Sequence, residues 1–107
     1  MANYRNSDAW KRTLELTLEI YRATVRFPEE ETFGLTAQVR RAAIVASSLA
    51  AEGEFEKARG AMIEIETQII VAARLDYLPK PAARRLYKLA RAAVKTLTRD
   101  RISSGTV

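Results

Sequence analysis

The sequence predicts an all-α protein, a single antiparallel up-down-up-down four-helix bundle domain spanning residues 1–107. Four Gly and three Pro are the strong helix breakers, and they fall between long stretches rich in Ala, Leu, Glu, Lys and Arg, which favour helix. No stretch alternates apolar and polar residues as a half-buried strand does. Because short connections favour antiparallel neighbours, consecutive helices should run up and down the bundle.

The helix breakers delimit each element in turn. The first predicted helix ends at Phe27, because a residue that precedes proline disfavours helical geometry. Gly53 can adopt the left-handed backbone that ends the second, and Pro81 suits the first position of the fourth. The predicted helices cover about residues 8–26, 35–52, 54–76 and 81–101, and residues 102–107 are expected to form a short tail.

The composition excludes several classes of function. The chain has no Cys and no His, which removes disulfides, thiol nucleophiles, imidazole bases and the Glu-x-x-His ligands of di-iron bundles. We therefore expect no enzymatic activity, no cofactor and no metal site. No apolar run reaches the roughly 18 residues of a membrane span, and the first residues lack the apolar core of a signal peptide. A cytoplasmic protein that does not contact a membrane is expected.

Two of the predicted helices carry more apolar surface than a lone bundle needs. The first has two stripes, Trp10, Leu14, Leu18, Tyr21 and Val25 on one side and Ala9, Leu16, Ile20, Ala23 and Phe27 on another. The third has a core stripe of Phe55, Ala58, Met62, Ile65, Ile69 and Ala72, with Ile63 and Ile70 beside it. Exposed apolar patches often mark association, so a homo-oligomer is expected. The alternative is that loops or the tail cover the surplus.

The last predicted helix is strongly basic within a chain of net charge +5. Between residues 80 and 101, Asp100 is the single acid. The candidate nucleic-acid-binding residues are Arg84, Arg85, Lys88, Arg91, Lys95 and Arg99. All but Arg85 fall within about 80° of the helical wheel. Like charges at such spacings repel, so a polyanion such as the RNA or DNA backbone is the natural complement. The alternative is a solvated face whose cations pair with acids on neighbouring helices.

Four further charged residues are candidates for a subunit interface or for structural ion pairs: Arg40, Arg41, Glu52 and Glu66. Glu66 lies near Arg59 on the helical wheel, at the edge of the apolar arc, which favours a buried or interfacial Glu with an Arg partner. Arg40 and Arg41 should face solvent or a subunit boundary. We expect them to pair with Glu29–Glu31 or Glu52 of the same or the next subunit, and direct phosphate contact is the alternative.

The segment Phe27–Ala43, FPEEETFGLTAQVRRAA, resembles a recurring motif of a bacterial four-helix bundle family, named for the protein encoded in 23S rRNA intervening sequences. The resemblance continues through Ala51–Gly53, Glu64–Ile69 and Ala72–Leu78, although the proline usual near Ala46 is missing and the connection before Glu64 is shorter. The resemblance implies a small bundle that forms a homopentameric ring. That family lies close to the accessory proteins of diversity-generating retroelements, so it also implies nucleic acid and a reverse transcriptase as partners.

Together, these patterns favour a non-enzymatic, oligomeric nucleic-acid-binding accessory protein. Its ligand would be structured RNA, or an assembly of RNA and reverse transcriptase, bound through the basic fourth helix. The alternative is a protein interaction scaffold that uses the same basic surface for an acidic partner protein.

Overall fold

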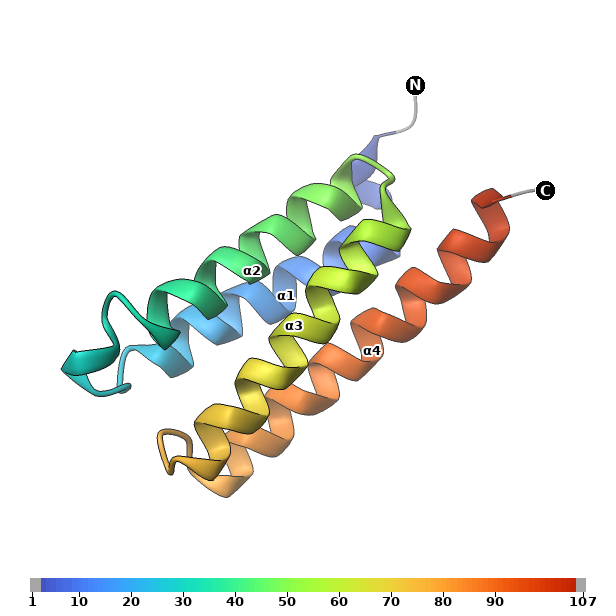
Figure 1. The fold of residues 1–107 in the computed structure, drawn as a ribbon. Helices are drawn as coiled ribbons and strands as arrows, with labels where there is room; N and C mark the ends of the chain where they lie inside the picture. The colour runs from blue at the N-terminus through green and yellow to red at the C-terminus, as the bar shows by residue number, and fades with distance from the viewer. Residues whose placement is uncertain (1–2, 106–107) are drawn as a thin grey trace.

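The computed structural model describes the backbone of residues 3–105 and side chains as far as Ile102. Four long helices form an antiparallel up-down-up-down bundle, which confirms the predicted fold class (Figure 1). The helices are α1 (Asp8–Thr24), α2 (Leu35–Ala51), α3 (Phe55–Arg74) and α4 (Lys80–Gly105), with short 3-10 helices η1 (Tyr4–Asn6) and η2 (Glu29–Glu31). Each long helix packs against two others, in the cyclic order α1, α2, α3, α4. The bundle measures 45 × 21 × 19 Å.

Several helix ends differ from the prediction, and α3 ends at Arg74 rather than near residue 76. α1 ends at Thr24 rather than near residue 26, because the Phe27 N–H donates to the Thr24 carbonyl at 3.1 Å and turns the chain ahead of Pro28. α4 begins at Lys80 and continues to Gly105, so the expected tail at 102–107 is wrong over 102–105; residues 106–107 lie outside the described part. No Pro or Gly interrupts residues 82–104, and an Arg101–Glu56 ion pair of 2.6 Å holds this end of α4 to α3.

The core is built from Ala and a few larger side chains. Leu16, Ile20, Met62, Ile65 and Leu97 are the large apolar residues that are fully buried. α3 therefore buries the stripe that its sequence predicted from Ala58 to Ala72, while Phe55 at its start is half-buried.

On α1, the stripe of Leu16 and Ile20 faces the core, and three threonines share its burial. Their hydroxyls bond to neighbouring backbone carbonyls, as Thr13 does to Ala9 at 3.0 Å, so their polarity is satisfied. The other stripe is largely outside, with Val25 74% exposed and Leu18 47% exposed. Tyr4 of η1 packs edge-to-face against Trp10 at 5.3 Å between ring centroids, whereas Leu18, Tyr21 and Val25 stay exposed.

The connections α1–α2 and α3–α4 lie at the same end of the bundle and are joined there (Figure 1). Glu31 Oε1 accepts the Leu35 N–H at 2.9 Å and so caps α2, while Oε2 accepts the Tyr77 hydroxyl at 2.9 Å. The Leu35 hydrogen bond and then the Tyr77 bond lower the pKa of Glu31, and the bond to Glu31 raises the pKa of Tyr77. A Cβ on Gly34 would lie 2.6 Å from Glu31 Oε1, so glycine leaves room for this cap.

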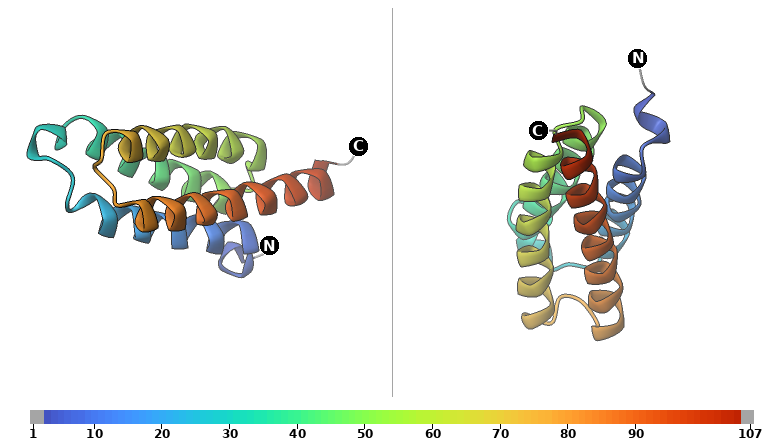
Figure 2. Two further views of the ribbon diagram at one scale, coloured as in Figure 1. Left: turned by 90° about the horizontal axis from the view of Figure 1, so that it is seen from below. Right: turned by 90° about the vertical axis from the view of Figure 1, so that its right-hand side faces the viewer.

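The α2–α3 connection at the opposite end is tight. Gly53 has a φ of 76°, which confirms the left-handed helix end that the sequence predicted. The left view of Figure 2 shows α4 reaching past the other helices at this end. Within the described chain, no helix is long and apolar enough to cross a membrane.

Candidate nucleic-acid interface

α4 turns one face to the core and its cations to solvent. Leu86, Ala90, Ala93 and Leu97 are buried against the other helices. The six candidate cations are all exposed: Arg84, Arg85, Lys88, Arg91, Lys95 and Arg99. We call these six residues the basic face. The helical wheel thus placed the charged and apolar sides of α4 correctly.

Neighbouring helices supply carboxylates to two cations of the basic face. Arg85 Nη2 lies 3.1 Å from Glu19 Oε1 on α1, and Arg91 Nη1 lies 3.2 Å from Glu66 Oε2 on α3. Glu66 itself is buried, with 8% of its surface exposed. Arg91 is therefore committed to neutralising a carboxylate that has little access to water.

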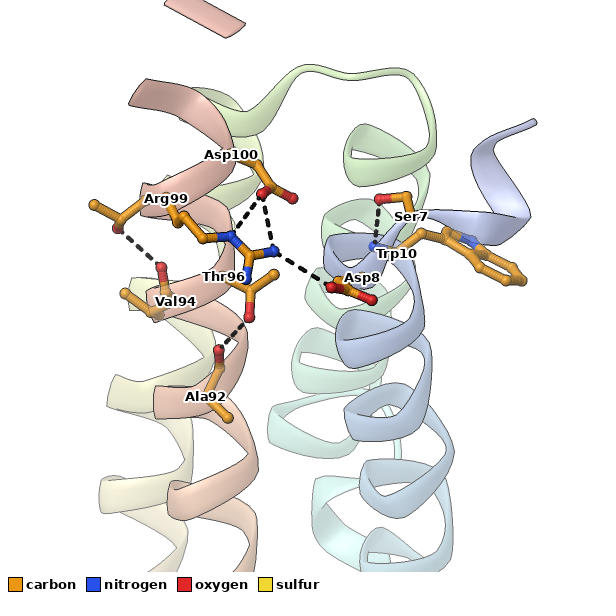
Figure 3. Close-up of polar contacts among 9 residues, drawn as sticks. Ser7, Asp8, Trp10, Ala92, Val94, Thr96, Arg99 and Asp100 are labelled. Carbon is orange, nitrogen blue, oxygen red and sulfur yellow. Dashed lines mark hydrogen bonds and ion pairs between the residues drawn. The ribbon is translucent and has the colours of Figure 1, made fainter. Parts of the chain in front are cut away.

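Arg99 forms a third pairing (Figure 3). Its Nε donates to Asp100 Oδ1 at 3.1 Å, and its Nη2 reaches Asp8 Oδ2 at 3.5 Å, at the start of α1. The hydrogen bond to Asp100 is the main cause of a raised pKa for Arg99, and the charge of Asp8 adds to it. Arg99 and Asp8 are exposed and Asp100 is half-buried, so the Arg99–Asp8 pair holds α4 to α1 only weakly.

The remaining cations of the basic face have no such neighbours. Among the described residues, Arg84, Lys88 and Lys95 have no carboxylate oxygen within 4.0 Å. We call these three residues the free row. At a rise of about 1.5 Å per residue, the free row extends over about 16 Å of the α4 axis. The charges of the basic face are thus partly neutralised, while the free row keeps its full charge.

The structure places Arg40 elsewhere than expected. Its Nε donates to Thr24 Oγ1 at 2.8 Å and its Nη2 to the Tyr21 carbonyl at 3.2 Å, while the guanidinium stacks over the Tyr21 ring at 4.6 Å. The expected pairing of Arg40 with Glu29–Glu31 or Glu52 in the same chain is therefore wrong. A buried hydroxyl on α1 and an aromatic face provide its contacts instead.

The other three candidates for structural pairs have different outcomes. Glu66 has an arginine partner as expected, but this is Arg91 of α4 and not Arg59 of its own helix. Arg41 and Glu52 are exposed, and neither forms an ion pair within the described chain. The Thr24–Arg40 contact was missed because a threonine between two apolar stripes gives no sign that it will accept an arginine.

The match to known proteins covers most of the chain. The model of one family, the 23S rRNA-intervening sequence protein, matches residues 5–99. A search of curated proteins found no match. The matched segment contains all four bundle helices up to Arg99, including the whole basic face. The chain therefore belongs to the 23S rRNA-intervening sequence protein family.

Proposed function

We propose that this protein is a non-enzymatic nucleic-acid-binding protein of the cytoplasm that holds structured RNA through the basic face of α4. The free row carries the proposal, because Arg84, Lys88 and Lys95 present three unneutralised charges on one exposed helix face. Each cation that contacts a phosphate releases counterions and adds affinity that falls with salt. The family's name refers to an rRNA, which favours RNA over DNA.

The scarcity of aromatic side chains argues for recognition of the backbone. Tyr87 is the exposed aromatic residue that α4 offers within the described chain, at 39% exposure. Proteins that read single strands stack successive bases on several aromatic rings. A row of cations without such rings instead suits the phosphates of a helical RNA, with little preference for sequence.

Self-association is a second part of the proposal. One apolar patch consists of exposed residues of α1, its C-cap and α2: Leu18, Tyr21, Val25 and Ile44. Another consists of Ile63 and Ile70, which are exposed on α3. These two apolar patches lie on different sides of the bundle, so one copy can meet the next head to tail, and such a contact closes into a ring or continues as a filament. A ring would repeat the basic face in every subunit.

The family resemblance gives the ring a size and a partner. We include in the proposal that the ring is a homopentamer and that a reverse transcriptase is a protein partner. Light scattering on the purified chain measures the subunit number directly, and a single-chain mass at all concentrations would overturn the ring.

The test of RNA binding is a salt titration with a labelled RNA hairpin and a DNA duplex of matched sequence. We expect a dissociation constant in the micromolar range near physiological salt, because non-specific binding typically falls at about 10⁻⁴–10⁻⁶ M. If both lysines contact phosphates, a Lys88→Gln, Lys95→Gln variant should lower the log–log salt slope by about 1.4–1.8, at roughly 0.7–0.9 per lost phosphate contact.

The matched control removes the same charge from the exposed Lys11 and Lys57 on α1 and α3. Lys11→Gln, Lys57→Gln should leave the slope nearly unchanged. Equal losses in both variants would mean that net charge alone attracts RNA, and no binding at low salt would overturn the proposal. Binding of polyglutamate with the same sensitivity to Lys88 and Lys95, without RNA binding, would favour the scaffold for an acidic partner.

A further inference from the structure

An aromatic side chain stands almost bare at the turn between α1 and α2. Phe33 is 95% exposed, the highest value among the large apolar residues that the structure describes. Its turn is held by hydrogen bonds on both sides: the Thr32 N–H and hydroxyl donate to the Glu29 carbonyl at 3.0 and 2.7 Å, and the Gly34 N–H donates to the Glu31 carbonyl at 3.0 Å. The turn therefore holds the backbone that carries Phe33, which lowers the entropic cost of docking its ring.

A groove of matching character lies at the same end of the molecule. It has a volume of about 750 Å³ and is lined by Ile69, Ile70 and Ala73 of α3 and by Ala83 and Tyr87 of α4, among others. These residues flank the α3–α4 connection, and the Tyr77–Glu31 hydrogen bond ties that connection to the α1–α2 connection that carries Phe33. Turn and groove are therefore at the same height along the bundle, the turn belonging to α1 and α2 and the groove to α3 and α4.

Unpaired charges of opposite sign accompany the two features. Glu29 and Glu30, just before Phe33, are exposed and form no ion pair among the described residues. Arg84 and Lys88, which also line the groove, belong to the free row. An acidic turn with an apolar tip thus complements an apolar groove with a basic rim.

We propose that the Phe33 turn of one copy docks into the α3–α4 groove of a second copy, with Glu29 and Glu30 against Arg84 and Lys88. A second copy of this chain fits the groove because its own turn carries the apolar Phe33 and the acidic Glu29 and Glu30 in one segment. The contact joins two different surfaces, so it is of the head-to-tail kind. Both surfaces lie at the same height along the bundle, as a ring about an axis parallel to the helices requires. The inference rests on the proposed self-association. In the docked assembly Arg84 and Lys88 face the acidic turn, so Lys95 is the cation of the free row that remains for RNA, and Lys88→Gln, Lys95→Gln should then lower the RNA salt slope by only about 0.7–0.9.

The decisive experiment is photo-cross-linking of the full chain with p-benzoylphenylalanine in place of Phe33, which keeps an aromatic group at the tip. Light and heavy isotope-labelled chains are mixed before irradiation, so that cross-links between copies are recognised by mass. We expect mixed cross-links from position 33 to peptides that contain Ile70 or Tyr87. The control places the same group at Tyr4, which is 42% exposed at the opposite end, and should give no link to those peptides.

A second measurement tests the charges. Glu29→Lys, Glu30→Lys should weaken self-association at least tenfold in sedimentation, and so should Arg84→Glu, Lys88→Glu. The chain that carries all four substitutions should regain it. A chain that self-associates but cross-links elsewhere from position 33, or that shows no rescue, overturns the docking and leaves self-association standing. A monomeric protein overturns both, while the effect of Lys95→Gln on the RNA salt slope reports separately on RNA binding.

Discussion

Thr17 Oγ1 on α1 lies 2.9 Å from Ser47 Oγ on α2, in the buried interface between these two helices. The Thr17 hydroxyl is also 2.8 Å from the Thr13 carbonyl and 3.1 Å from the Ala43 carbonyl across the helix interface. Both residues are buried. Because buried hydroxyls must find partners, this pair favours one register of α1 against α2 over its neighbours.

Replacing Thr17 by Val should therefore destabilise the bundle by about 1–2 kcal/mol, since the shape is kept while the buried Ser47 hydroxyl loses its partner on α1. Urea unfolding monitored by circular dichroism measures the change. The control is Thr67→Val on α3, an exposed threonine that bonds only to the Ile63 carbonyl of its own helix. Equal effects of the two substitutions would show that the Thr17–Ser47 contact adds nothing.

Two glycine-to-alanine substitutions should change the free energy of unfolding in opposite directions, one through the α2 cap and the other through helix propensity. Gly34→Ala should lower the free energy of unfolding by about 1 kcal/mol, because its Cβ displaces the Glu31 carboxylate from the α2 N-terminus. Gly60→Ala, in α3 with nothing within 4 Å of its Cβ, should raise it by up to about 1 kcal/mol. Thermal melts of both variants give the sign directly, and a stabilising Gly34→Ala would refute the role of the cap.

The Glu31 cap should also make the stability of the bundle depend on pH. The pKa of Glu31 is lowered in the folded state, so its ionised form stabilises the fold above the pKa of the unfolded chain, and that contribution is lost as pH falls through the folded pKa. The melting temperature of the native chain should thus exceed that of Glu31→Gln at pH 7. The difference should shrink below about pH 4, where carboxyls protonate. A constant difference from pH 7 to pH 2 would contradict the ionic contribution.

Freeing Arg91 should strengthen RNA binding. Glu66→Gln removes the carboxylate that pairs with Arg91 at 3.2 Å, so this arginine becomes available to a phosphate. We expect a steeper salt slope, by about 0.7–0.9, and tighter binding at low salt. Glu64→Gln on the same helix makes the same change of net charge at an exposed position and is the control. If both variants gain equally, Arg91 is not part of the RNA contact.

The sequence predicted most of the fold because its signals are local. Proline, glycine and the 3.6-residue period of Met62, Ile65 and Ile69 depend only on near neighbours along the chain. Which of the two apolar stripes of α1 faces the core could not be predicted in this way. The buried side includes three threonines, whose hydroxyls bond to backbone carbonyls, and apolar periodicity does not show this. The continuation of α4 beyond residue 101 also depends on a distant partner, Glu56.

For the candidate site too, the local features could be predicted from the sequence and the contacts between helices could not. A helical wheel shows that the cations of α4 share an exposed face, but it does not show which of them are neutralised. Glu19 is 66 residues from Arg85 and Asp8 is 91 residues from Arg99, so these pairings arise only when the helices pack. The hydrogen bond from Arg40 to Thr24 also joins two helices, so the sequence did not predict it.

The unequal lengths of the helices have a consequence for local opening. α4 has 26 residues and α1 has 17, a difference of about 13 Å at the usual rise, and the excess of α4 projects beyond the bundle (Figure 2). Backbone amides near the buried Leu97 should exchange with solvent deuterium only when the whole bundle opens, whereas those of residues 102–105 should exchange when the end of the helix frays. Within this one helix, the residue at which protection from exchange is lost should therefore mark the end of the part that unfolds together with the bundle.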